Sequence, residues 1–173
     1  MSGAFQVSGK NAKALFTLKM HRGDGMALIA MNWKKSRPPP DFVGFAIEHK
    51  PPNSDRFFTL RNRLSFAGET GDVNPNRLST RLSPIQKFRW VHFPFDAEQL
   101  GDFIYRVTPV FMAENDTLSY GEFQEVAIEL GHLVVDLAYC RVLLYGVEVA
   151  LTRKEYAVLA QLARHPGRVI TQQ

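Results

Sequence analysis

Histidine and cysteine are the side chains of this sequence best suited to acid-base chemistry or to binding a metal such as zinc. The chain of 173 residues contains one cysteine and five histidines, namely Cys140 and His21, His49, His92, His132 and His165. The histidines stand in or beside different runs of sequence, and no His-x-His or Cys-x-x-Cys pair occurs. Catalysis needs a positioned group with its base and an orienting partner. We therefore expect no enzyme activity, no metal site and no cofactor.

Three further features of the sequence bear on possible ligand binding. Neither G-x-G-x-x-G nor G-x-x-x-x-G-K occurs, so a phosphate-binding loop of either kind is not supported. The tripeptide Arg22-Gly23-Asp24 lies in HRGDG between two strand-like runs, and we interpret it as a turn. Trp33 and Trp90 are interpreted as core or partly buried residues rather than as a ligand cage.

Four basic residues in the last part of the chain are candidates for phosphate contacts with nucleic acid: Arg153, Lys154, Arg164 and Arg168. Contacts of this kind are sensitive to salt and carry no base preference. A solvated helix face explains the same four charges equally well, so both interpretations stay open.

Composition and charge limit the class of protein. With 45% hydrophobic and 22% charged residues, the chain is close to the average for soluble globular proteins. The formal net charge of +4 permits a nucleic-acid partner without requiring one. The part up to Leu130 has 16 basic and 14 acidic residues and the remainder has 5 and 3, so each carries +2. Charge therefore does not mark either part as the nucleic-acid end.

Cysteine usage and hydropathy bear on location. A single cysteine excludes an internal disulfide and fits a reducing compartment. The N-terminal sequence MSGAFQVSGKNAKALF lacks the apolar core of a signal peptide, and no run of about 18 apolar residues occurs. We expect a cytoplasmic protein that does not interact with membranes.

Residues 12–130 show the short aromatic and β-branched runs, separated by turn residues, that are typical of an antiparallel sandwich or barrel. The expected strands lie in AKALFTLKM, MALIAMNW, DFVGFAIEH, RFFTLRNRL, IQKFRWVHF, DFIYRVTPVFM and EFQEVAIEL. Within KFRWVHF, Trp90 and His92 share one face while Val91 and Phe93 share the other, and neither face is purely polar. Pro109 predicts an edge strand or a bulge.

Two more local expectations concern loops and cysteine. Residues 67–84 are polar and rich in turn formers, which predicts an exposed loop whose basic residues Arg77 and Arg81 carry ordinary solvated charge. Cys140, in AYCRVLL, is expected to pack as a small hydrophobic residue in a strand.

The pattern changes at Gly131. A short strand is followed by the hairpin CRVLLYGVEVAL, with its turn at Tyr145-Gly146, and then by a helix. Thr152 fits the N-cap and Glu155 completes a capping box. Tyr156, Leu159, Ala160 and Ala163 form an apolar stripe, and His165-Pro166-Gly167 ends the helix.

The segment VVDLAYCRVLLYGVEVALTRKEYAVLAQLARHPGRVIT carries a strand pair D-L-A-x-x-x-V, a hairpin G-V-E-V, a helix start L-T-x-x-E-Y and an exit H-P-G-R-V-I-T. In this order the pieces resemble the OmpR/PhoB-type winged-helix DNA-binding domain, the output domain of response regulators in two-component phosphorelay systems. The resemblance covers residues 131–173 and implies double-stranded DNA as the partner.

The same resemblance implies a sheet, a first helix, a helix-turn-helix and a wing, of which only the sheet and first helix have counterparts here. In such folds the third helix enters the major groove. We therefore expect a truncated unit with little sequence-specific binding. We also expect an apolar face at Tyr156, Leu159 and Ala163 that is left uncovered and open to self-association or to a protein partner. Residues 1–130 lack the alternating β-α order of a receiver domain.

Residues 1–130 resemble the N-terminal β-sandwich domain found ahead of the catalytic region in some bacterial phospholipase D-like proteins. The likeness lies in GAFQVSGKNAKALFTLKMHRGDGMALIAMNWK, PPDFVGFAIEHK, RLSTRLSPIQKFRWVHFP and YRVTPVFM, but the catalytic motif His-x-Lys-x4-Asp is absent. The expected architecture is mainly β, with an antiparallel immunoglobulin-like β-sandwich over 1–130 and a small sheet with one helix over 131–173. DNA-binding transcription regulation is the first functional hypothesis, and a non-catalytic sandwich interaction module is the alternative.

Overall fold

The computed structural model describes residues 4–64, 78–130, 133–144 and 146–164. It confirms that the chain is mainly β, with antiparallel sheets. The chain divides into two compact units at the junction of Leu130 and Gly131. We call the first the two-sheet unit and the second the C-terminal unit.

The first sheet of the two-sheet unit has the strand order β1-β2-β3-β6. Its strands are β1 (Gln6–Ser8), β2 (Phe16–Gly23), β3 (Met26–Trp33) and β6 (Arg89–His92). β2 and β3 form a hairpin that closes at Gly23 and Met26, so HRGDG contains the turn that was expected. Gly25 has a φ of 62°, the left-handed conformation that a short turn of this kind requires.

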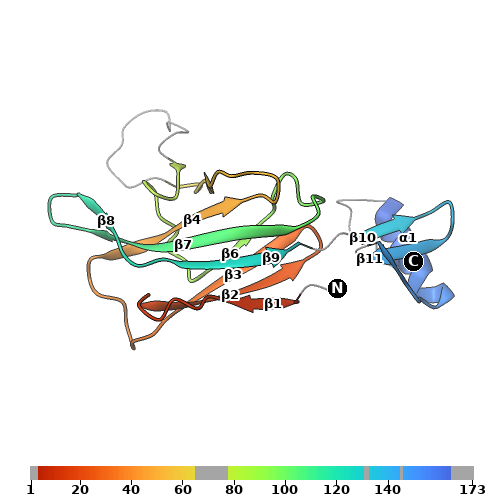
Figure 1. The fold of residues 1–173 in the computed structure, drawn as a ribbon, viewed down its shortest axis with the longest axis horizontal. Helices are drawn as coiled ribbons and strands as arrows, with labels where there is room; N and C mark the ends of the chain where they lie inside the picture. The colour runs from red at the N-terminus through yellow and green to blue at the C-terminus, as the bar shows by residue number, and fades with distance from the viewer. Residues whose placement is uncertain (1–3, 65–77, 131–132, 145, 165–173) are drawn as a thin grey trace, which may run out of the picture. The chain divides into compact units, whose positions relative to one another are not determined.

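The second sheet has the order β5-β4-β7-β8, with β9 also paired to β7. Its strands are β4 (Phe42–Lys50), β5 (Phe58–Thr59), β7 (Asp102–Met112), β8 (Leu118–Tyr120) and β9 (Gln124–Glu129). Figure 1 shows β4, β7 and β9 in one layer and β1, β2 and β3 in the other. Each of the seven predicted runs contains a strand, whereas the three-residue strands β1 and β8 were not predicted from sequence.

The core lies between the two sheets. Phe16, Leu18 and Met20 of β2 alternate inward and are buried, as are Phe45 and Ile47 of β4. The rings of Phe16 and Phe45 lie 5.0 Å apart, which places one contact directly across the two layers. Trp33 is buried and Trp90 packs partly buried against this core, as expected from sequence.

A buried glutamine links the two layers by hydrogen bonds. Gln124 of β9 is 2% exposed. Its side-chain amide donates to the carbonyls of Asn11 (2.9 Å) and Phe16 (3.1 Å), and its Oε1 accepts from the Asn11 N–H at 2.9 Å. Burying an amide is costly unless its groups are paired, and here each is.

Pro109 lies in a central strand, so the prediction of an edge strand or a bulge in this run is wrong. β7 pairs with β4 on one side and with β8 and β9 on the other. The Pro109 carbonyl accepts a hydrogen bond from the Gly121 N–H at 3.0 Å. Because both backbone groups of a strand residue face the same neighbour, the missing N–H falls in the break between β8 and β9. The register irregularity lies instead in β4, between Phe42 and Gly44.

The segment expected as an exposed loop at 67–84 is buried near its end. Residues 65–77, including Arg77, lie outside the described residues. Thr80 is fully buried and exchanges two hydrogen bonds with the Ile47 backbone, at 3.0 and 2.9 Å. Arg81 is not simply solvated charge, because its guanidinium pairs with Glu48 at 3.0 Å and lies over the Tyr120 ring. Thr80 thus provides a strand-like pairing that turn-forming composition did not predict.

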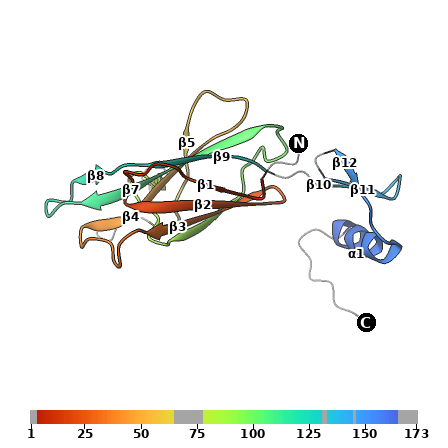
Figure 2. The ribbon, with the colours of Figure 1, turned by 60° about the horizontal axis from the view of Figure 1, so that its bottom comes forward.

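The C-terminal unit contains a three-stranded antiparallel sheet of order β10-β11-β12 followed by helix α1 (Figure 2). Its elements are β10 (Leu133–Asp136), β11 (Arg141–Leu144), β12 (Val147–Val149) and α1 (Arg153–Arg164). The expected capping box is present: Glu155 Oε2 accepts from the Thr152 N–H at 2.7 Å, and Thr152 Oγ1 accepts from the Glu155 N–H at 3.3 Å. Tyr156 Oη donates to the Asp136 carbonyl at 3.3 Å and ties the helix to the sheet.

One expectation for this unit is wrong, and a second holds only in part. Cys140 is exposed, with a φ of 51°, and lies in the turn before β11, where Asp136 accepts backbone N–H bonds and sets the chain direction. Of the face expected to be uncovered, Ala163 is exposed, but Tyr156 and Leu159 are partly buried. The other exposed apolar residues of α1 are Ala157, Val158 and Leu162.

Candidate functional site

The segment that leads into β6 is fixed to its neighbours by backbone and side-chain hydrogen bonds. Ile85, which is buried, exchanges two backbone hydrogen bonds of 2.9 Å with Phe45 of β4. The Asn62 side-chain amide donates to the carbonyls of Ser83 and Pro84, both at 3.1 Å. These bonds hold Asn62 against Ser83 and Pro84, and the segments 62–64 and 83–85 form two walls.

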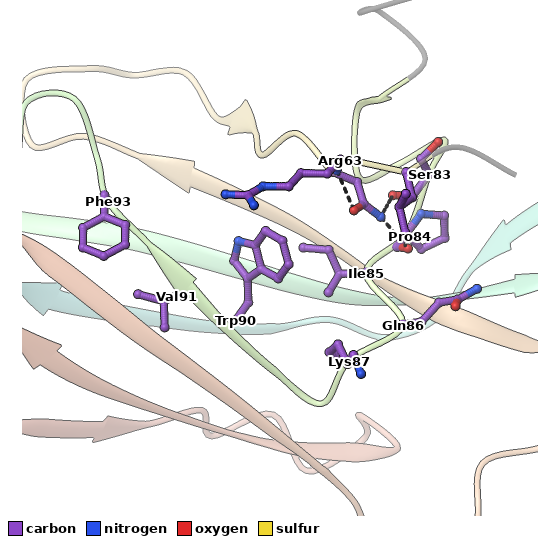
Figure 3. A pocket seen from close by; sticks show the side chains of 11 residues that line it. Arg63, Ser83, Pro84, Ile85, Gln86, Lys87, Trp90, Val91 and Phe93 are labelled. Carbon is purple, nitrogen blue, oxygen red and sulfur yellow. Dashed lines mark hydrogen bonds between the residues drawn. The ribbon is translucent and has the colours of Figure 1, made fainter. Parts of the chain in front are cut away.

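These walls and β6 enclose a pocket of about 580 Å³, which we call the edge pocket (Figure 3). It is lined by Asn62, Arg63, Leu64, Ser83, Pro84, Ile85, Gln86, Lys87, Trp90, Val91 and Phe93. Ligand sites in proteins commonly have volumes of about 300–1,000 Å³ and a mostly apolar lining with a few polar groups. The edge pocket has both properties.

The edge pocket wraps around the unpaired edge of β6. Adjacent residues of a strand point to opposite faces, and the pocket is lined by both Trp90 and Val91. A pocket that contacts both faces of β6, and no residue of β3, lies along the edge away from β3. Among the described residues no strand pairs with this edge.

The backbone of β6 presents hydrogen-bonding groups to the same edge. The Met31 N–H donates to the Phe88 carbonyl at 2.8 Å. Trp90 and His92 lie two and four residues further along, so their backbone groups also face β3. Because the bonded residues of an antiparallel strand alternate, Arg89 and Val91 direct their N–H and C=O groups away from β3. A strand that approached β6 from the pocket side would find these groups available.

The edge pocket is basic and partly apolar. Arg63 and Lys87 line it, and no acidic residue does. Phe93 is 68% exposed, which is unusual for a ring of this size. Figure 3 shows the Trp90 ring next to Ile85 and the side chain of Arg63 extended from the neighbouring segment. The lining therefore suits a ligand that combines apolar groups with negative charge.

Two of the histidines that appeared unrelated in sequence meet inside the two-sheet unit. His49 of β4 and His92 of β6 come from different sheets, and their ring centroids lie 4.7 Å apart. His92 Nδ1 lies 2.8 Å from the hydroxyl of Tyr105, which is fully buried. No spacing in the sequence relates His49 to His92, and the two rings come together only because the two sheets pack on each other.

Burial keeps this histidine pair uncharged at neutral pH. Desolvation, aided by the neighbouring His49, lowers the pKa of His92 to about 4, and burial also lowers the pKa of His49. Burial raises the pKa of the Tyr105 phenol, so the phenol keeps its proton and shares a hydrogen bond with His92 Nδ1. In the described part of the chain, no three His, Cys, Asp or Glu side chains converge as a metal-binding group.

The three described phosphate-contact candidates, Arg153, Lys154 and Arg164, are exposed but do not form one cluster. Arg153 and Lys154 lie in the first turn of α1 and Arg164 lies in its last turn, so about 16 Å of helix separates the two ends. Arg168 lies outside the described residues. Among the three described residues, only Arg153 and Lys154 are close enough to act together.

Comparison with protein-family models, curated proteins and solved structures finds no match to this chain.

The residues of the edge pocket were not predicted as a site. One signal was present in the sequence, because apolar Val91 and Phe93 share the outer face of a strand where polar residues are usual. No helix among the described residues belongs to the two-sheet unit, so this face has no helical cover there. In the described residues, no helix is long and apolar enough to span a bilayer.

Proposed function

We propose that residues 1–130 form a non-catalytic, immunoglobulin-like β-sandwich interaction module that binds an extended peptide in the edge pocket. The observation that carries this proposal is the edge of β6 with which no described strand pairs, and whose backbone groups at Arg89 and Val91 adjoin the pocket. In strand addition, main-chain hydrogen bonds provide affinity and pockets for alternate side chains provide specificity. Both components are present along β6.

The charges and apolar side chains that line the edge pocket indicate which side chains the peptide carries. Arg63 and Lys87 in the lining and Arg89 in β6 favour acidic side chains on one face of the incoming strand. Trp90, on the opposite face of β6 from Arg89, favours apolar side chains at the alternate positions of that strand. Phe93 continues the face of Arg89 and adds an apolar contact at its end. The proposed partner is therefore an extended segment in which apolar and acidic residues alternate.

The replacement Val91→Pro is expected to weaken peptide binding strongly without unfolding the module. Proline removes the N–H that faces the open edge, whereas the bonds to β3 are made by Trp90 and His92. Binding of a labelled peptide that alternates valine and glutamate, measured by fluorescence anisotropy, should weaken by about tenfold or more. The same peptide with lysine in place of glutamate should bind weakly to the unmodified protein.

Two phenylalanines provide a matched comparison for this test. Phe93→Ala removes a ring that lines the edge pocket, and Phe95→Ala removes an exposed ring that does not. We expect weaker binding only for the first variant. Equal affinities for both variants, together with an unchanged affinity for Val91→Pro, would show that the peptide does not bind at β6.

A second candidate function, DNA binding in transcription regulation, is supported by the C-terminal unit. The antiparallel sheet followed by a capped helix agrees with the start of the OmpR/PhoB-type domain that the sequence resembles. Arg153 and Lys154 are exposed in the first turn of α1, where the helix dipole also favours anions. We propose that these two residues contact DNA phosphates in a cytoplasmic regulator.

Removing these two charges is expected to reduce the salt dependence of DNA binding. Each phosphate contact contributes about 0.9 to the slope of log affinity against log salt. The double variant Arg153→Ala, Lys154→Ala should therefore lower the slope by about 2 for any duplex sequence. The measurement is a salt titration with a labelled duplex, and Lys19→Ala in β2 serves as the control. An unchanged slope in the double variant would contradict the proposed contacts.

A further inference from the structure

A second pocket, of about 350 Å³, lies where the C-terminal end of β3 meets the segment that precedes β2. We call it the basic pocket. It is lined by Ala12, Lys13, Ala14, Leu15, Trp33, Lys34, Lys35, Arg37 and Pro39. It shares no residue with the edge pocket.

The walls of the basic pocket are held in place by the fold. The Lys34 N–H donates to the Leu15 carbonyl at 3.0 Å, and Lys34 Nζ donates to the Ala12 carbonyl at 2.8 Å. Trp33 is only 8% exposed, and its ring lies 4.9 Å from that of Phe42. The Phe42 N–H in turn donates to the Pro39 carbonyl at 3.1 Å. A ligand would thus meet a preorganised floor and one ammonium group already positioned.

The pocket is lined by four positively charged residues, Lys13, Lys34, Lys35 and Arg37. No acidic residue lines it. None of these four residues forms an ion pair with another described residue. Like charges gathered in one concave site raise its positive potential and attract anions. The two-sheet unit as a whole carries only +2, so this concentration of charge is local.

We propose that the basic pocket binds phosphate groups that carry two or more negative charges. A single carboxylate would leave most of the four cations unbalanced. Ammonium groups bind phosphate as point charges, and the Arg37 guanidinium can bind two phosphate oxygens at once. The volume is at the lower end for ligand sites, which suits a compact diphosphate-like group rather than a large ligand.

The test measures binding of inorganic pyrophosphate to the full chain by titration calorimetry, and binding of the chain to vesicles of neutral lipid with or without phosphatidic acid. The test variant is Lys35→Glu with Arg37→Glu, because both side chains are exposed and neither makes a hydrogen bond or ion pair among the described residues. The matched control is Lys19→Glu with Arg56→Glu, which changes net charge equally at exposed positions outside the pocket.

We expect the test variant to weaken binding by about tenfold or more for each reversed charge, and the control by about twofold or less. Pyrophosphate binding that follows this pattern indicates a free phosphate ligand, whereas vesicle binding alone that follows it indicates a lipid headgroup. The absence of binding to both probes, or equal losses in the test and control variants, would overturn the proposal. Thermal unfolding of both variants establishes that the fold is retained.

Discussion

Lowering the pH from 7 to 4 is expected to reduce the free energy of unfolding of the two-sheet unit by about 3 kcal/mol through His92 alone. In the unfolded chain this histidine takes up a proton near its ordinary pKa of 6.5, whereas burial lowers its pKa in the folded state to about 4. Between these two values the unfolded state binds more protons than the folded state. Stability is therefore complete above pH 6.5 and decreases as the pH falls toward 4. His49, whose pKa is lowered by burial, changes stability in the same direction.

Urea unfolding at a series of pH values measures this effect. His92→Gln keeps a side chain that can hydrogen-bond to the Tyr105 hydroxyl but removes the titrating ring, so it should flatten the dependence of stability on pH between pH 6.5 and 4. His21→Gln is the matched control, because His21 lies on β2 outside the histidine pair. If the His92→Gln protein lost stability with acid as steeply as the unmodified protein, His92 would not be the group responsible.

The replacement Gly44→Ala is expected to destabilise the two-sheet unit by about 3–4 kcal/mol, for two additive reasons. Gly44 has a φ of 137°, a conformation that residues with a side chain rarely adopt. A Cβ atom at this position would lie 2.7 Å from the Ile85 carbonyl oxygen, which belongs to the backbone and cannot move aside alone. Because Ile85 forms part of the edge pocket and is bonded to Phe45, peptide binding should weaken as well.

Gly25 provides the control within the same unit. It also has a positive φ, of 62°, but a Cβ there would meet only the Ala97 side chain at an ordinary 3.5 Å. Gly25→Ala should therefore cost about 1 kcal/mol, the backbone contribution alone. Chemical denaturation of the two variants compares the costs. Similar losses for both would mean that the contact with Ile85 does not contribute.

Local features of the fold were predictable because they depend on residues close in sequence. The capping box of α1 joins Thr152 and Glu155, three positions apart, and both bonds are present. The runs MALIAMNW and DFIYRVTPVFM match β3 and β7 in full. Alternating burial in RWVH also agrees with the two faces read from the sequence.

Features that depend on a partner strand were harder to predict. Pro109 was read as an edge signal because proline lacks one hydrogen-bond donor, but the structure places that position beside a break between two short neighbouring strands. The buried Thr80 lies in polar sequence, and its bonds go to Ile47, 33 positions away. Composition describes a segment's preference for water and does not describe the strand that covers it.

The amino-acid sequence alone determined the β-rich character of the chain, the start of its helix and the change in pattern at Gly131. Each of these follows from side-chain alternation or capping over a few residues. Only the tertiary structure decided which histidines meet, which edge of β6 is left without a partner among the described strands, and how Lys13 comes to share a pocket with Lys35 and Arg37. These proximities arise when the two sheets bury their apolar faces, so they depend on strand order and register rather than on spacing along the chain.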